Sequence, residues 1–128
     1  MKNKSKLNKI KTGGPKILRN WFYMATDEVS VDDIKGVWEK DYDVEIWRDV
    51  EILEIGLNEG GIDIECCPTD RWDEYSKDYL NAYKVKKVYA VSVTEKGYDE
   101  CMEAMKRLTK ELGGWFAADT DDFIPRIG

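Results

Sequence analysis

Carboxylates recur at alternate positions in one part of this sequence. In "VEIWRDVEILEIGL", positions 44 to 57, and in "IDIE", positions 62 to 65, Glu or Asp alternates with Ile, Val or Leu. A period of two is typical of β-strands, because successive side chains point to opposite faces of a sheet. The pattern therefore predicts a small sheet with one apolar and one acidic face.

The chemistry available to such a face is the binding of a cationic partner. Like charges that lie opposite each other across strands destabilise a sheet, and a docking cation relieves that repulsion. The predicted partner-binding residues are Glu45, Trp47, Asp49, Glu51, Glu54, Asp63 and Glu65, followed by Asp70, Trp72, Asp73 and Glu74 in the next loop. A merely solvated face is one alternative, and a lysine-rich N-terminal arm folded back on the sheet is another.

Tryptophan adds an apolar anchor to this acidic stretch. Trp21, Trp38 and Trp115 are expected in the core, but the alternation directs Trp47 to the side of Glu45. An exposed Trp among carboxylates has the composition of a protein-interface hot spot, since it buries a large area and stacks on Arg. We expect this role for Trp47 more than for Trp72.

Catalytic motifs are not evident. The chain has no His, which removes Ser/His and Cys/His nucleophiles and the usual zinc ligands. Asp119, Asp121 and Asp122 could bind a hard cation, but they lack EF-hand spacing and are better explained as a polar turn. The acids around Cys66 and Cys67 favour raised thiol pKa values and a structural role. No catalytic residue, metal or cofactor is predicted.

Charge is divided unevenly along the chain. Residues 1 to 26 carry seven cations and no acid, residues 27 to 79 carry 18 acids against five cations, and residues 80 to 128 carry eight of each. The acidic middle generates a field that attracts a basic partner and repels nucleic acid. We therefore expect no direct nucleic-acid binding.

Length and composition indicate one domain. A chain of 128 residues can bury a core without disulfides or a metal. Residues 1–15 alternate Lys with polar residues and end in Gly-Gly-Pro, so we expect a flexible basic arm before a single domain over residues 16–128. Three unpaired-looking cysteines, with no apolar signal or membrane segment, favour a reducing cytoplasm.

In the first half of the domain we expect a strand, then a helix, then further strands. A strand over residues 16–26 precedes a helix starting near Val31, where Ser30 and Asp33 form a capping-box pair. The apolar phase reverses near Ile52, which predicts a β-bulge. A hairpin loop at Glu59 and Gly60 would then set Glu54 directly opposite Glu65.

The second half repeats this order. We expect a loop with a short helical turn over residues 73–82, a central strand over 85–93, a helix capped by Thr94 and stopped by Gly113, and a last strand from residue 115. The fold class is α+β, with an antiparallel sheet, two helices on one face and a ferredoxin-like split βαβ order with an extended hairpin.

In size, acidity and element order the chain resembles the small immunity proteins that bacteria make against their own polymorphic or contact-delivered toxins. The stretches that carry this resemblance are "VEIWRDVEILEIGLNEGGIDIE" and "GGWFAADTDDFIP". It implies a cytoplasmic, non-catalytic inhibitor that covers one basic toxin with carboxylates.

The alternatives are a polyanion mimic that inhibits a DNA-binding protein, a small metal-dependent enzyme using Asp119, Asp121 and Asp122, and an adaptor or homodimer formed through the open sheet. Oligomeric state is left open.

Overall fold

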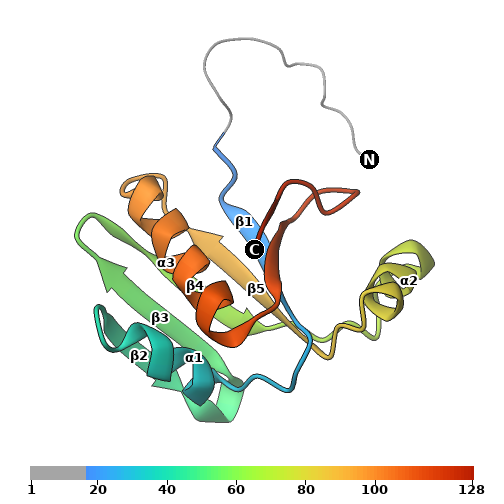
Figure 1. The fold of residues 1–128 in the computed structure, drawn as a ribbon, viewed down its shortest axis with the longest axis horizontal. Helices are drawn as coiled ribbons and strands as arrows, with labels where there is room; N and C mark the ends of the chain where they lie inside the picture. Colours follow the sequence, from blue (N-terminus) through green and yellow to red (C-terminus); the bar gives the residue numbers. More distant parts are fainter. Residues whose placement is uncertain (1–16) are drawn as a thin grey trace, which may run out of the picture.

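A computed structural model describes residues 17–128 of the chain (Figure 1). The basic arm expected at residues 1–15 lies outside this range. The elements are β1 (Asn20–Ala25), α1 (Val31–Trp38), β2 (Asp43–Trp47), β3 (Ile52–Leu57), β4 (Gly60–Cys66), α2 (Glu74–Ala82), β5 (Lys87–Val93), α3 (Tyr98–Leu112), β6 (Trp115–Ala118) and β7 (Arg126–Ile127).

The strands form one seven-stranded sheet in the order β2-β3-β4-β5-β1-β6-β7, and every neighbouring pair is antiparallel. This confirms the α+β class and the antiparallel sheet. The ferredoxin-like arrangement with two helices is not confirmed, because the sheet is wider and a third helix is present. Figure 1 shows α1 and α3 over one face of the sheet, with α2 at the far end of the molecule.

The main core lies between the sheet and the α1/α3 layer. Leu53, Ile62 and Ile64 are fully buried and belong to one apolar cluster with the inner sides of both helices. Trp38 of α1 is also fully buried, and its indole Nε1 donates a hydrogen bond to the Ala104 carbonyl of α3 at 2.9 Å. The two helices are therefore joined to each other through this side chain.

The start of α1 is encoded locally, as predicted. Ser30 is the N-cap, its Oγ accepts from the Asp33 amide at 3.1 Å, and the Asp33 carboxylate accepts from the Ser30 amide at 2.9 Å. Val29 and Ile34 on either side of the cap are both buried. The capping box thus fixes where α1 begins and how the chain enters it.

The expected β-bulge near Ile52 was wrong. The apolar phase reverses because the chain turns there: a single 3-10 turn, Arg48–Val50, and Glu51 in a left-handed conformation (φ 53°) join β2 to β3. Trp47 then pairs with Ile52 across the turn. A long strand with an inserted residue and two strands with a four-residue connection give the same alternation in sequence, so periodicity could not separate them.

The register of the next hairpin was also wrong, by two residues. Leu57 pairs with Gly60, so the loop consists of Asn58 and Glu59 instead of Glu59 and Gly60. Glu54 faces Asp63, and Glu65 faces Ile52. Both registers keep apolar residues on one face, because a shift of two preserves the side-chain alternation. Gly60 adopts φ 130°, which only glycine tolerates well next to this tight turn.

The second face of the sheet is covered only in part. Leu80 of α2 packs with Met24, Val88 and Trp115 in a smaller apolar cluster over β1, β5 and β6. The short helical turn predicted over residues 73–82 is thus a full helix, α2, that packs on the second apolar cluster. Its sequence is mainly polar because only one of its sides is apolar. No described residue outside the sheet packs on the part of this face over β2, β3 and β4.

The cap expected at Thr94 was wrong. Helix α3 begins at Tyr98 after Gly97, and Thr94 instead binds the neighbouring hairpin, where its Oγ1 accepts from the Gly61 amide at 3.0 Å. Gly113 ends α3, as expected. Between residues 17 and 128, no helix combines the length and apolar character needed to cross a bilayer.

The burial of the tryptophans gives a direct test of this architecture. Trp38 is fully buried, whereas Trp47 is 44% exposed. We expect Trp38→Ala to lower the free energy of unfolding by about 3–5 kcal/mol through cavity formation, and Trp47→Ala to lower it by less than about 1 kcal/mol. Urea denaturation measures both values. Equal losses for the two variants would contradict the assigned faces.

Candidate protein-binding face

Three carboxylates form a row across neighbouring strands on the uncovered part of the sheet. Glu45 of β2 pairs with Glu54 of β3, and Glu54 pairs with Asp63 of β4. All three side chains are exposed. Adjacent strands lie about 4.8 Å apart, so each carboxylate has a like charge as its nearest cross-strand neighbour. The row continues into Ser92 of β5, which is small and neutral.

No ion pair within residues 17–128 involves this row. Within that part of the chain, ion pairs join Lys35 to Glu39, Arg48 to Asp32, Lys87 to Glu51, Lys106 to Glu103 and Arg107 to Asp41. None of them involves Glu45, Glu54 or Asp63. The fold therefore holds three like charges together without a described counter-charge, at a cost of tenths of a kcal/mol to about 1 kcal/mol per opposed pair.

A second row on the same face is apolar at its edge. Trp47 pairs with Ile52, and Ile52 pairs with Glu65, while Ala90 of β5 continues the row. Trp47 is 44% exposed and Val50, in the turn beside it, is 58% exposed. The prediction that Trp47 points to the acidic side is confirmed. We name the surface formed by Glu45, Trp47, Ile52, Glu54, Asp63 and Glu65 the outer face.

Two predicted strand residues lie elsewhere. Asp49 is exposed in the 3-10 turn, off the sheet. Glu51 turns to the helix side, where the Lys87 ammonium donates to its carboxylate at 2.6 Å and also lies over the Tyr89 ring. The hydrogen bond from Lys87 lowers the pKa of Glu51, and the same bond raises the pKa of Lys87. The left-handed backbone of Glu51 is what takes it out of the alternation.

The loop residues of the predicted set do not join the outer face as a group. Asp73 is the N-cap of α2, and its carboxylate accepts from the Ser76 amide at 2.8 Å, a bond that lowers the pKa of Asp73. Trp72 is half-buried in the second apolar cluster, with its ring 5.1 Å from that of Phe22. Asp70 and Glu74 are exposed near α2. Trp72 is therefore a core residue, and Asp73 has a structural role.

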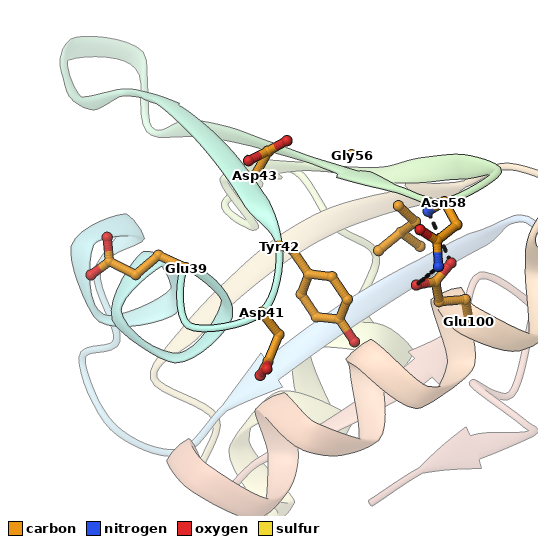
Figure 2. A pocket seen from close by; sticks show the side chains of 8 residues that line it. Glu39, Asp41, Tyr42, Asp43, Gly56, Asn58 and Glu100 are labelled. Carbon is orange, nitrogen blue, oxygen red and sulfur yellow. Dashed lines mark hydrogen bonds between the residues drawn. The ribbon is translucent and has the colours of Figure 1, made fainter.

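A separate acidic hollow lies at the end of β2 and β3 that is away from the turn between Trp47 and Ile52 (Figure 2). It has a volume of about 330 Å³ and is lined by Glu39, Asp41, Tyr42, Asp43, Gly56, Leu57, Asn58 and Glu100. Most of its carboxylates are already engaged. Glu39 pairs with Lys35, Asp41 pairs with Arg107, and Glu100 accepts from both the backbone and side-chain amides of Asn58 at 3.0 and 3.2 Å. These contacts join loops to helices and explain the hollow structurally.

The aspartates at residues 119–122 form a turn. The carboxylate of Asp122 accepts from the Ile124 amide at 3.2 Å and from the Thr120 hydroxyl at 3.2 Å. Burial raises the pKa of Asp119, although this residue keeps part of its surface exposed. Over residues 17–128, no three His, Cys, Asp or Glu side chains are placed to hold a metal ion. The hydrogen bonds of Asp122 form the polar turn that was predicted here.

The cysteines have the raised thiol pKa values expected from their surroundings. Burial is the main cause for Cys66 and Cys67, and the Glu51 carboxylate adds to it for Cys66. Cys101 of α3 faces the core, where burial again raises the thiol pKa. None of the three has the lowered pKa of a reactive thiol.

Sequence reasoning missed the neutral strip beside the acidic row. Ala90 and Ser92 of β5 continue the two rows of the outer face, and Asn20 of β1 pairs with Ser92. The alternation of Val91, Ser92 and Val93 contained this signal, but the apolar density of residues 85–93 predicted only a central strand. Ile52 was missed because the alternation before the expected bulge placed it in phase with Val44 and Ile46, on the apolar side.

Comparison with known protein families, with curated proteins and with solved structures finds no match to this chain.

Neutralising the middle of the acidic row should stabilise the isolated protein. Glu54 has a like charge on both sides, so we expect Glu54→Gln to raise the free energy of unfolding by tenths of a kcal/mol to about 1 kcal/mol. Urea denaturation at low salt measures the gain. At about 1 M salt, where the Debye length is about 3 Å, the gain should shrink. A loss of stability, or a gain that salt does not change, would contradict the repulsion.

The Glu51–Lys87 pair should contribute to stability in a defined pH range. Because the pKa of Glu51 is lowered on folding, its contribution is present above the unfolded value of about 4.3 and is lost as pH falls through the folded value. Both side chains are partly exposed, 41% and 23%, so solvent screening keeps the contribution small, below about 1 kcal/mol.

Thermal unfolding between about pH 5 and pH 3 tests this contribution. Glu51→Gln should lose less stability over that range than the wild-type protein. Glu111→Gln removes the same charge from α3, away from this pair, and should behave as wild type. If Glu51→Gln followed the wild-type curve, the pair would have no energetic role.

Proposed function

We propose that this chain is a non-catalytic binding protein whose outer face neutralises a basic protein partner. The observation that carries the proposal is the row Glu45–Glu54–Asp63, in which each residue pairs with the next across the strands without a cation among the described residues. Folding does not need these charges at these positions. A docking Lys or Arg would convert their mutual repulsion into attraction, chiefly raising the association rate and the specificity.

The apolar edge of the outer face supplies an anchor that can be buried against the partner, which charge alone does not provide. Trp47, Val50 and Ile52 lie together at the turn between β2 and β3, beside Glu45 and Glu65. A buried aromatic anchor with a polar surround is the usual composition of an interface hot spot, and Trp also accepts a cation over its ring. Ala90 and Ser92 have small side chains beside the row, so they leave room for a folded partner to approach it.

In the most specific form of this proposal, the partner is a toxin and this chain is its immunity protein. Support for this form comes from the resemblance in size, acidity and element order described for the sequence, together with the acidic, partly aromatic outer face. A basic toxin, such as a nuclease, has the cationic active-site surface that this face would cover.

The polyanion mimic receives less support from the geometry. The three opposed carboxylates span only two strand spacings, about 10 Å, whereas a DNA duplex presents one charge per about 1.7 Å along its whole axis. A groove that binds DNA would therefore meet only a short acidic segment here.

Affinity capture from the source cells tests the proposal, with two variants of equal net charge. The sheet variant is Glu45→Gln, Glu54→Gln and Asp63→Asn, and the control variant is Asp99→Asn, Glu103→Gln and Glu111→Gln on α3. We expect wild type and control to retain one basic protein at low salt, the sheet variant to lose it, and the activity of the captured protein to fall when wild type is added.

Equal capture by both variants would contradict a role for the outer face. Capture that depends on the row but leaves the partner's activity intact would exclude the inhibitor and leave a binding protein only.

A further inference from the structure

The free edge of the sheet beside the outer face is the other unexplained feature. Among residues 17–128, β2 pairs only with β3 and ends the strand order, so no described strand lies along the other side of its backbone (Figure 1). Its residues alternate between exposed Asp43, Glu45 and Trp47 and half-buried Val44 and Ile46. Val44 and Ile46 pack against the main core but remain partly open at this edge.

The hydrogen-bond pattern shows which backbone groups point outward. The Cys66 amide donates to the Glu51 carbonyl at 3.0 Å, which marks the hydrogen-bonded pairs between β3 and β4. Because such pairs alternate in an antiparallel ladder, Ile52, Glu54 and Gly56 direct their backbone groups toward β2. In β2, their partners Trp47, Glu45 and Asp43 direct their own backbone groups back toward β3. Val44 and Ile46 therefore direct N–H and C=O to the open edge.

Among the described residues, acidic charge is this edge's one protection against added strands. Natural edge strands are blunted by charged side chains, especially Lys, or by Pro, a bulge or a covering element. β2 contains no Pro or Lys, pairs with β3 without a bulge and runs for five residues. Its charges are acidic, so pairing with the same edge of a second copy would bring carboxylates together. An extended basic segment would meet no such repulsion.

We infer that β2 accepts an added strand from the basic partner, an extended segment that alternates Lys or Arg with apolar residues. This inference rests on the proposed function and names how the partner binds. The cationic side chains would lie beside Glu45 and Trp47 on the outer face, and the apolar ones would cover Val44 and Ile46. Main-chain hydrogen bonds would add affinity, and the alternating side chains would set specificity.

Amide hydrogen exchange in the full chain tests the added strand with two synthetic peptides. One is an eight-residue peptide of alternating Lys and Val, and the other has the same sequence but a methyl group on every backbone nitrogen. Both carry the same charge, but only the first can donate main-chain hydrogen bonds. At about ten times its Kd, the first should slow exchange of the Val44 and Ile46 amides about tenfold, and the second should not.

Three results would overturn the inference. In the first, neither peptide slows exchange of the Val44 and Ile46 amides. In the second, the methylated peptide slows that exchange as much as the unmethylated one. In the third, both amides already exchange slowly in the free protein, because its own residues or a second copy fill the edge. The proposed function fails separately. If the Glu45, Glu54 and Asp63 sheet variant bound the methylated peptide as tightly as wild type, the outer face would not attract cations.

Discussion

The alternation of side chains across the sheet constrains the rest of this structure. Each strand that gives Ile or Leu to the α1/α3 layer must turn the residues between them to the opposite face. Over β1, β5 and β6 that opposite face is apolar and packs against Leu80 of α2 together with Trp72 and Phe123 from loops. Over β2, β3 and β4 it is acidic and exposed in the part of the chain that the structure describes. One sheet thus has a closed half and an open half.

The open half is where the energetics of the fold and the proposed function meet. Glu45, Glu54 and Asp63 repel one another across strands, and buried neighbours such as Leu53, Ile62 and Ile64 hold them in place. Burying one such side chain contributes about 1.5–3 kcal/mol, which exceeds the cost of an opposed charge pair. The core can therefore maintain an electrostatically unfavourable surface, and a cationic partner could use that surface for binding.

Local signals in the sequence were sufficient for part of this account. The capping box at Ser30, the stop at Gly113 and the alternation around Glu45 each depend on neighbouring residues, so they were predictable. The turn at residues 48–51, the hairpin register and the cover provided by α2 were not. A shift of two residues leaves the apolar pattern unchanged, and the left-handed Glu51 gives no signal in residue type. The position of Trp72 against Phe22 depends on a contact between distant segments.

The five tryptophans provide the most direct measurement of the central claim. Trp21 and Trp38 lie in the main core, Trp72 and Trp115 lie near α2, and only Trp47 lies on the outer face. The indole N–H signals of ¹⁵N-labelled protein, titrated with the captured basic partner, therefore report on each region separately. The proposed interface predicts that the Trp47 signal shifts most and that the other four change little. A shift confined to Trp72 and Trp115, with Trp47 unchanged, would place the partner at α2 and contradict the outer face as the binding surface.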